Sequence, residues 1–355
     1  MLVGVLGRVW IAGRVSRLAV LVSLIGAIVL FGAGSAASHA TGSKRLGTIA
    51  FIRMANNARA FGGRLFVIRP DGTGLRQLTP PGTAVWWYSW SPDGRSIAYV
   101  DQRLSLWLVR SDGTGRRLLL PTSRVSSETL SWSPDGKAIA IVSPGRDANP
   151  RRGYTTYGLY VVPVGGGPPR RLPAGKHVGW YGLAWAPRGD EIYYSNRGIW
   201  AIRPNGTGRR KISPVGGAEG LSADGSQFVF GVSRYSAFGV VNADGTGYHV
   251  VTTHAYTEYG EVWSPTGHRI LYGRADNHGI YVIDPDSRNN HRITRDSPPR
   301  ADWPALAWSP DGGSIVYDAG TYKNTDLYVI GADSRDKVQL TNTPDIDIDP
   351  TWVAR

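Results

Sequence analysis

The sequence of 355 residues contains no cysteine and only two methionines. Without cysteine the folded protein has no disulfides, so its stability must come from packing and hydrogen bonding. The sequence also lacks a Gly-x-Ser-x-Gly nucleophile motif and a phosphate-binding glycine loop. No other nucleophile stands at a recognisable spacing from a base, so the motifs of common hydrolases and nucleotide-binding enzymes are missing.

What the sequence does contain is a repeat built around a tight turn. Residues 91–94, 133–136 and 309–312 read Ser-Pro-Asp-Gly, and weaker copies occupy 186–189, 222–225 and 264–267. Five of these six copies directly follow a tryptophan, and each leads into an apolar run that is typical of a buried strand. The copies begin 36 to 53 residues apart, a spacing that predicts one four-stranded propeller blade per copy.

The two ends of the repeat array complement each other. Seven second strands are predicted, but the first of them, over residues 48–52, has no inner strand before it. An unmatched strand, Pro-Thr-Trp-Val-Ala, occupies 350–354. Its pairing with the first blade would leave no unpaired edge. We therefore predict an all-β fold, a seven-bladed β-propeller closed by pairing of the C-terminal strand with the first blade; six or eight blades remain open if a weak copy is misread.

The first 40 residues lie outside the repeat. Three arginines precede an uncharged apolar run over residues 18–31, and small residues follow it up to Ala40. This order is typical of a secretory signal peptide, and an uncleaved N-terminal membrane anchor is the alternative. We predict a signal peptide or anchor at 1–40 and a single β-propeller domain at 41–355. The protein would then be exported, periplasmic or extracellular in a bacterial cell envelope, and monomeric.

Positive charge is in excess and comes mainly from arginine. The formal net charge is +13, and only six residues are lysine. Many arginines, such as Arg76, Arg116 and Arg170, fall on predicted outer strands or turns, where a charge protects a sheet edge from unwanted pairing. The alternative is affinity for anionic envelope polymers or phospholipid headgroups. No nucleic-acid partner is expected, because no base-stacking motif accompanies the charge.

Residues 90–99 read Trp-Ser-Pro-Asp-Gly-x-x-Ile-Ala-Tyr, and Leu-Tyr-Val, Asp-Gly and Leu-Thr motifs recur after such segments. This pattern resembles the TolB-type (WD40-like) β-propeller repeat and implies that fold for residues 47–355. The α/β domain of TolB and the hydrolase domain of peptidases with this repeat are not expected here. Oligogalacturonate lyases are similar in architecture and hold a metal with histidines, whereas only His177 and His254 could approach that place in this sequence. The resemblance thus implies the fold more strongly than an activity.

Acidic and aromatic residues recur just upstream of the inner-strand tryptophans, at the expected rim of the central channel. Aromatic rings stack on the apolar faces of sugars or peptides, and carboxylates accept hydrogen bonds from hydroxyl or amine groups. The predicted ligand-binding residues are Trp86, Trp87, Glu128, Trp180, Tyr181, Glu258, Tyr259, Asp302 and Trp303. In the competing interpretation the rings cover the core and the acids accept hydrogen bonds from loop amides.

Three alternating carboxylates form a candidate metal site. On an extended strand Asp345, Asp347 and Asp349 would lie on one side, and oxygen ligands of this kind suit Ca²⁺. The segment lacks the glycine and the glutamate of an EF-hand loop. The expectation is therefore no cofactor, with Ca²⁺ at these three residues as the alternative.

Taken with the missing catalytic motifs, these features favour a binding protein. We predict an exported, non-enzymatic β-propeller that binds a protein or glycan of the cell envelope through its loop face and channel mouth, and we assign no catalytic residue. The alternative is a carbohydrate-active enzyme, similar to polysaccharide lyases, with its site in the central channel. A sensor domain follows instead if residues 1–40 are retained as an anchor.

Overall fold

The structure is a computed structural model that describes residues 46–55, 62–121, 130–144, 157–175, 178–179, 182–218, 220–232, 237–252, 258–274, 279–295, 305–321 and 323–354. For Pro144, Glu258 and Tyr259 only the backbone is described. These residues form 28 β-strands. Within them, no helix has the length and apolar character needed to cross a bilayer. Residues 1–40, the predicted signal peptide or anchor, lie outside the described part.

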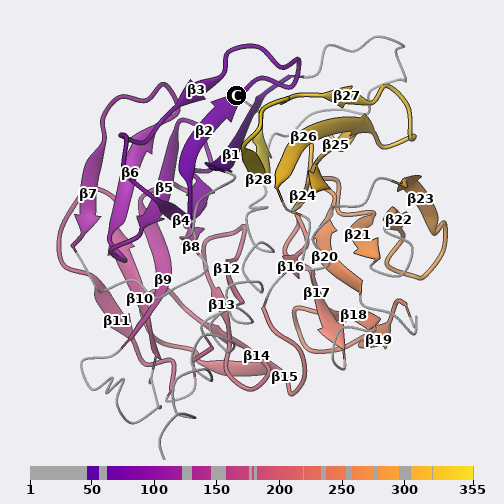
Figure 1. Ribbon diagram of the computed structural model, residues 1–355. Coiled ribbons are helices and arrows are strands. Elements are labelled where there is room, and N and C mark those ends of the chain that lie inside the picture. Colours follow the sequence, from indigo (N-terminus) through magenta and orange to yellow (C-terminus); the bar gives the residue numbers. More distant parts are fainter. Residues whose placement is uncertain are drawn as a thin grey trace, which may run out of the picture.

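Five separate sheets each contain four antiparallel strands that follow one another along the chain (Figure 1). The first two contain β4 (Val85–Trp90), β5 (Ser96–Asp101), β6 (Leu106–Arg110) and β7 (Arg117–Leu120), and β8 (Leu130–Trp132), β9 (Ala138–Pro144), β10 (Tyr157–Pro163) and β11 (Arg170–Leu172). The third contains β12 (Leu183–Trp185), β13 (Ile192–Ser195), β14 (Ile199–Ile202) and β15 (Arg210–Ser213). The last two contain β16 (Gly220–Leu221), β17 (Gln227–Val232), β18 (Ala237–Asn242) and β19 (His249–Val250), and β20 (Glu258–Trp263), β21 (Ile270–Arg274), β22 (Gly279–Ile283) and β23 (His291–Thr294).

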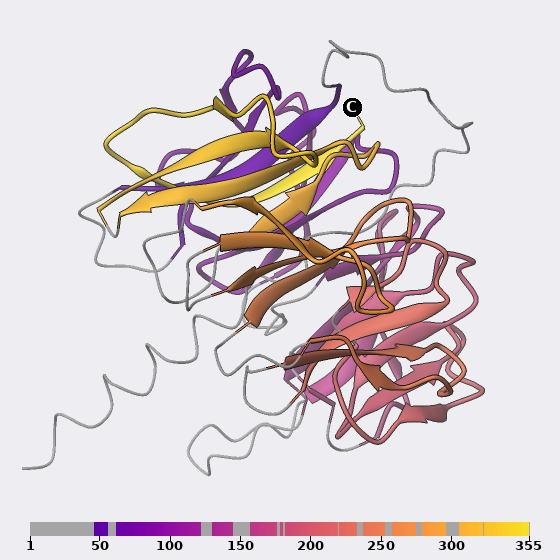
Figure 2. The same cartoon turned by 90° about the vertical axis from the view of Figure 1, so that its right-hand side faces the viewer.

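The remaining eight strands form one sheet that joins the two ends of the described chain. It contains β1 (Thr48–Met54), β2 (Arg64–Ile68), β3 (Arg76–Gln77), β24 (Leu306–Trp308), β25 (Ser314–Thr321), β26 (Asn324–Gly331), β27 (Val338–Gln339) and β28 (Ile346–Val353). The C-terminal strand β28, in yellow, runs beside the indigo β1 (Figure 2). The two pair antiparallel, with Trp352 opposite Ile49. The predicted pairing of the C-terminal strand with the first blade is therefore confirmed.

The number of separate blades differs from the prediction. We expected seven, and the structure shows five four-stranded blades beside the eight-stranded sheet. The eight strands are continuous because β26 and β28 run side by side at one end, where Thr325 pairs in parallel with Ile346. This bridge depends on where β28 begins, and the repeat pattern does not encode that position. The all-β propeller fold holds, but the count of seven separate blades is wrong.

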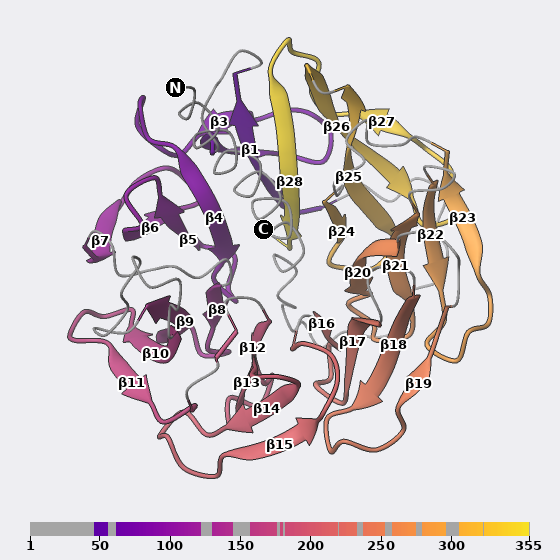
Figure 3. The same ribbon diagram turned by 60° about the horizontal axis from the view of Figure 1, so that its bottom comes forward.

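The sheets are arranged in a ring with β4, β8, β12, β16, β20 and β24 on its inner side (Figure 3). Each of these inner strands ends close to a Ser-Pro-Asp-Gly-like turn, and most end in a tryptophan. The indole N–H of Trp132 donates to the carbonyl of Ser89 at 3.2 Å, and that of Trp308 donates to the carbonyl of Val262 at 3.2 Å. Because each acceptor belongs to the inner strand of the preceding sheet, these tryptophans join neighbouring sheets as well as filling the core.

The turns owe their shape to a hydrogen-bonded serine and aspartate. The hydroxyl of Ser91 donates to Asp93 Oδ1 at 2.6 Å and accepts from the N–H of Ser96 at 2.9 Å. The same Oδ1 atom accepts from the N–H of Arg95 at 3.0 Å. Side chains that satisfy turn amides in this way favour a tight turn over a longer loop. We call the end of the ring with these turns the turn end, and the opposite end the loop end.

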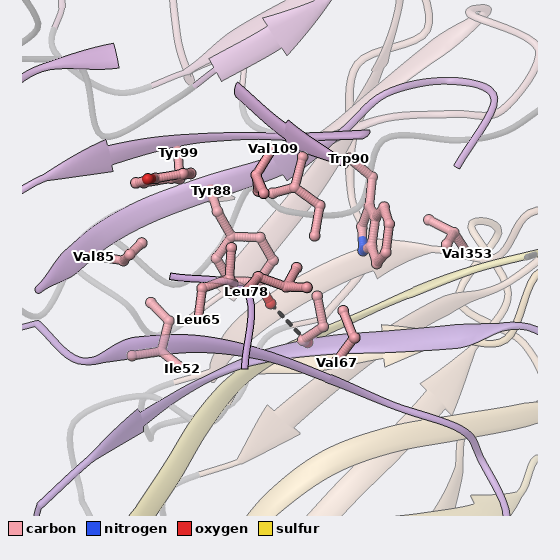
Figure 4. Close-up of a cluster of buried hydrophobic side chains, with 12 residues drawn as sticks. Ile52, Leu65, Val67, Leu78, Val85, Tyr88, Trp90, Tyr99, Val109 and Val353 are labelled. Atoms are coloured by element: carbon pink, nitrogen blue, oxygen red, sulfur yellow. Dashed lines mark hydrogen bonds between the residues drawn. The ribbon is translucent and has the colours of Figure 1, made fainter. Parts of the chain in front are cut away.

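Apolar side chains fill the space between adjacent sheets. One cluster lies between the sheet of β1 and the sheet of β4, and its largest members are Tyr88, Trp90 and Tyr99 (Figure 4). The hydroxyl of Tyr88 reaches across the cluster to the carbonyl oxygen of Ala50 at 2.8 Å. The hydroxyl of Thr351 on β28 donates to the same Tyr88 oxygen at 3.1 Å. The seam between β1 and β28 is thus hydrogen-bonded to the neighbouring sheet through buried groups.

Candidate functional site

The predicted rim lies at the loop end of the ring, where inner strands begin and second strands finish. Only part of it is described. Five of the predicted ligand-binding residues lie outside the described residues, namely Glu128, Trp180, Tyr181, Asp302 and Trp303, as do the side chains of Glu258 and Tyr259. Their role remains a prediction. Trp86, Trp87 and the three aspartates at the start of β28 can be placed.

Trp86 and Trp87 lie at the start of β4, where the strand is irregular. The pairing of β4 with β5 shifts between Val85 and Trp87, so Trp86 occupies a β-bulge. A bulge of this kind turns a side chain away from the regular alternation of the strand. The two indole rings lie 5.5 Å apart at an angle of 47°.

The two tryptophans have different surroundings. Trp87 packs against the core between the sheets of β4 and β8, as the competing interpretation of the rim rings expects. Trp86 is half-buried, and its indole nitrogen has no hydrogen-bond acceptor among the described residues. Buried donors are nearly always satisfied, so this N–H, which is itself shielded from solvent, is an exception to the rule, as is that of Trp263 in the core. Among the predicted rim residues whose side chains are described, Trp86 is the one whose polar atom lacks a protein partner, and its role in ligand binding stays a prediction.

A glycine fixes the backbone beside Trp86. Gly63 and Val85 exchange two backbone hydrogen bonds, 3.1 Å and 2.7 Å long, which link the start of β2 to the start of β4. A Cβ atom at Gly63 would lie 2.4 Å from the carbonyl oxygen of Arg53, so a larger residue does not fit. The bulge is therefore held against the first sheet by a contact that only glycine permits.

The charged residue nearest this junction on β1 is Arg53, which forms a buried ion pair with Asp347 on β28. Arg53 Nε lies 2.6 Å from Asp347 Oδ1, and Nη2 lies 2.7 Å from Oδ2. The guanidinium also lies 5.4 Å from the ring centre of Phe51 and 5.0 Å from that of Phe66. Because Asp347 binds it with two parallel hydrogen bonds, the pKa of Arg53 is raised above its ordinary value.

Two further acids surround this pair. Asp345 lies 3.8 Å from Arg64, and both are partly exposed. Asp326 on β26 is buried and accepts hydrogen bonds from the Thr343 N–H and the Thr341 hydroxyl, each at 3.2 Å. Burial raises the pKa of Asp326 above its ordinary value, and the charge of Asp347 adds to the effect. The loop end of the eight-stranded sheet thus contains a compact group of acids and arginines.

The expected alignment of Asp345, Asp347 and Asp349 is wrong. Asp349 has a positive φ of 57°, and the pairing of β28 with β1 shifts between Ala50 and Ile52, so the regular alternation of side chains is interrupted. Asp347 is fully buried against Arg53. In the described ranges no three His, Asp or Glu residues are placed together to hold a metal ion. Calcium binding by these three carboxylates therefore stays an untested prediction.

Sequence reasoning missed Arg53 and Asp326, as well as a cleft at the turn end. Arg53 and Asp326 each adjoin a buried apolar run, a position where a charge signals a specific partner. The cleft has a volume of about 190 Å³ and lies between two Ser-Pro-Asp-Gly turns, beside Trp132. The Oδ1 atom of Asp93 there is already bound by Ser91 and by a backbone N–H. This cleft is therefore the space between two turns whose polar side chains are already hydrogen-bonded within the protein.

Antiparallel sheets in a ring, with a C-terminal strand paired to an N-terminal one, define the chain as a β-propeller protein. The chain belongs to the TolB β-propeller domain family, whose profile matches residues 41–303. The family resemblance of the repeat is therefore confirmed. No curated protein matches the sequence.

Solved structures share this fold at low sequence identity. Oligogalacturonate lyase from Vibrio parahaemolyticus aligns with a TM-score of 0.62 and 13% identity over 81% of this chain and 92% of that one. TolB from Acinetobacter baumannii aligns with a TM-score of 0.54 and 15% identity over 86% of this chain, which spans 66% of the TolB chain. Dipeptidyl peptidase 4 from Porphyromonas gingivalis gives 0.51 and 14% over 82% of this chain and 50% of that one. Identities this low indicate the fold and leave the activity open.

Proposed function

We propose that this chain is an exported, non-enzymatic β-propeller that binds a protein or glycan of the cell envelope through the loop end of its ring. The observation that supports this most directly is Trp86, a half-buried ring with an unsatisfied indole N–H, set at the rim by a bulge. Loops on a rigid scaffold are the usual place for binding residues.

The binding proposal is tested by replacing Trp86, Trp180 and Trp303 together with alanine. Affinity capture from an envelope extract with the mature chain should retain a partner that the triple variant fails to retain. A control variant replaces three exposed apolar residues away from this end, Leu75, Leu118 and Tyr248. Equal retention by a folded triple variant and the wild type would exclude the rim as the binding site.

A second candidate function is cleavage of an acidic polysaccharide. Its support is the fold similarity to oligogalacturonate lyase, which covers 92% of that enzyme. The test is incubation with polygalacturonate in the presence of added Mn²⁺ or Ca²⁺. A lyase would release unsaturated sugars that absorb in the ultraviolet, and their appearance would replace the binding proposal with an enzymatic one.

Export is part of the proposal and has a separate test. A basic start, an apolar run and small residues in positions 1–40 support a cleaved signal peptide. N-terminal sequencing of the mature protein from the producing cell should begin near residue 41. An intact N-terminus in the membrane fraction would instead support an anchored sensor.

A further inference from the structure

Three consecutive outer strands of the ring bear an unusual concentration of positive charge. The exposed residues at the start of β7, β11 and β15 are Arg116, Arg117, Arg170, Arg171, Arg209, Arg210 and Lys211. No acidic residue lies on these three strands. The other outer strands carry less charge: β19 starts with His249, β23 with His291 and Arg292, and β27 directly follows Lys337. The charge therefore marks one arc of the circumference and is not a general property of outer strands.

Two of these arginines are held in the same way. Arg116 donates from Nε to the hydroxyl of Tyr99 at 2.7 Å and lies over the ring of Trp107, 3.6 Å from its centre. The rings of Tyr99 and Trp107 are themselves stacked, 6.5 Å apart and within 11° of parallel.

The sheet of β12–β15 repeats the arrangement. Arg209 donates from Nε to the hydroxyl of Tyr194 at 2.9 Å and lies 4.0 Å from the ring centre of Trp200. The hydroxyl of Tyr194 in turn donates to the carbonyl oxygen of Ala174 at 3.0 Å. A tyrosine, a tryptophan and an arginine from three adjacent strands thus form the same triplet in two sheets.

The triplet holds the guanidinium in a fixed position, but the tyrosine accepts from only one of its N–H groups. Only Nε is used by the tyrosine, and among the described residues neither Arg116 nor Arg209 has an ion-pair partner. The two Nη groups form the planar fork that binds an oxyanion with two parallel hydrogen bonds. A fork that is already immobilised by stacking loses less conformational freedom when an anion binds.

Other arginines in the arc fix the spacing between the strands. Arg117 donates to the carbonyl of Val164 in the next sheet, and Arg170 donates to the carbonyl of Pro204 in the sheet after it. Only Arg210 has an acidic partner within the described residues of this arc, Glu191 at 2.8 Å. The arc is therefore a fixed set of cations with little internal neutralisation.

We propose that this arc is a binding surface for a flexible linear polymer of oxyanions, in which Arg116 and Arg209 are two specific anion sites. The strands β7, β11 and β15 follow the curved circumference of the ring (Figure 3). A flat membrane would meet such a curve over a narrow strip, whereas a flexible chain can follow it past all three strands. The repeating group is a phosphate or a carboxylate, since a guanidinium fork fits both. This surface is distinct from the loop end.

The test measures the affinity of the mature chain for polyphosphate and for polygalacturonate of matched length, at about 50 and about 200 mM salt. The variant Arg116→Gln/Arg209→Gln should bind at least about tenfold more weakly, because two charge-assisted contacts are lost. The slope of log affinity against log salt should fall by about two. The control Arg288→Gln/Arg335→Gln removes two exposed arginines from the opposite part of the ring and should bind like the wild type.

A second variant distinguishes specific binding by the guanidinium forks from general electrostatic attraction. Arg116→Lys/Arg209→Lys retains the charge and loses the fork, so it should weaken binding by several fold. If the glutamine variant does not fold, Arg171→Gln/Lys211→Gln removes two charges outside the triplets and should lower the salt slope in the same way. The polymer that binds more tightly identifies the oxyanion. Absence of binding by the wild type, equal binding by the arginine-to-glutamine variant and its control, or binding to anionic phosphatidylglycerol vesicles alone would overturn the proposal.

Discussion

The ion pair between Arg53 and Asp347 provides the strongest test of how the ring is closed. Asp347 is fully buried and Arg53 is 8% exposed, so removal of either partner leaves a charge in a site that water does not reach. The cost of leaving one member of such a pair unpaired is about 3–5 kcal/mol. We expect Asp347→Leu and Arg53→Met each to lower the free energy of unfolding by about that amount.

The double variant should be more stable than either single variant. Replacement of a buried ion pair by apolar residues of similar volume is often neutral, because the cost of desolvating both charges disappears with them. Because each single variant costs about 3 kcal/mol or more and the double variant costs less than either, the double-mutant cycle should give a coupling energy of at least about 3 kcal/mol. Urea unfolding followed by circular dichroism measures all four proteins, and equal m-values would show that the unfolded states are comparable.

A neighbouring ion pair supplies the control. Asp345 is two residues away on the same chain segment, but it is partly exposed and lies 3.8 Å from Arg64. Exposed pairs contribute about 0–1 kcal/mol, so Asp345→Asn should change stability little. If Asp347→Leu costs no more than Asp345→Asn, the pair does not hold β28 against β1 and the reasoning is refuted.

Two further predictions concern stability. Burial raises the pKa of Asp326 above the ordinary value of 3.8, so this residue stabilises the fold most below pH 3.8 and loses that contribution as the pH rises through its folded pKa. Asp326→Asn should therefore gain stability relative to the wild type between acidic and neutral pH in urea unfolding; a difference that does not vary with pH would contradict this. The tight turn at residues 186–189 has Ala186 and Arg188 where most other copies have serine and aspartate. Ala186→Ser/Arg188→Asp should raise the unfolding free energy by about 0.5–1.5 kcal/mol, and an unchanged denaturation midpoint would show that the side-chain hydrogen bonds do not stabilise these turns.

Local sequence patterns were sufficient for much of the fold. All seven predicted second strands are present, because each is a buried run rich in β-branched or aromatic residues and six of them follow a turn of defined chemistry. The pairing of β28 with β1, which places Trp352 opposite Ile49, was predictable from the sequence. The first blade lacks an inner strand, and an unmatched strand stands at the C-terminal end of the repeats. These inferences need only the periodicity of the chain and the rule that sheet edges must be paired or protected.

The remaining features depend on contacts between distant residues. The bridge from Thr325 to Ile346, which joins two groups of strands into one sheet, is set by the register of β28. The Arg53–Asp347 pair connects residues 294 positions apart, and the positive φ of Asp349 breaks an alternation that the sequence predicts. At the rim, a bulge at Trp86 interrupts the alternation of β4, and the next residue, Trp87, packs against the core between two sheets. Residue type suggested a site there, but only the backbone distinguishes the two rings.

The seam between β1 and β28 also sets the order of events during synthesis. Asp347 follows Arg53 by 294 residues, which a ribosome adds in roughly 15 to 60 s. Throughout that interval the nascent chain presents the edge of β1, with Ile49 and Phe51, to anything able to add a strand. The edge of β1 therefore acquires its partner strand only after almost the whole chain has been made.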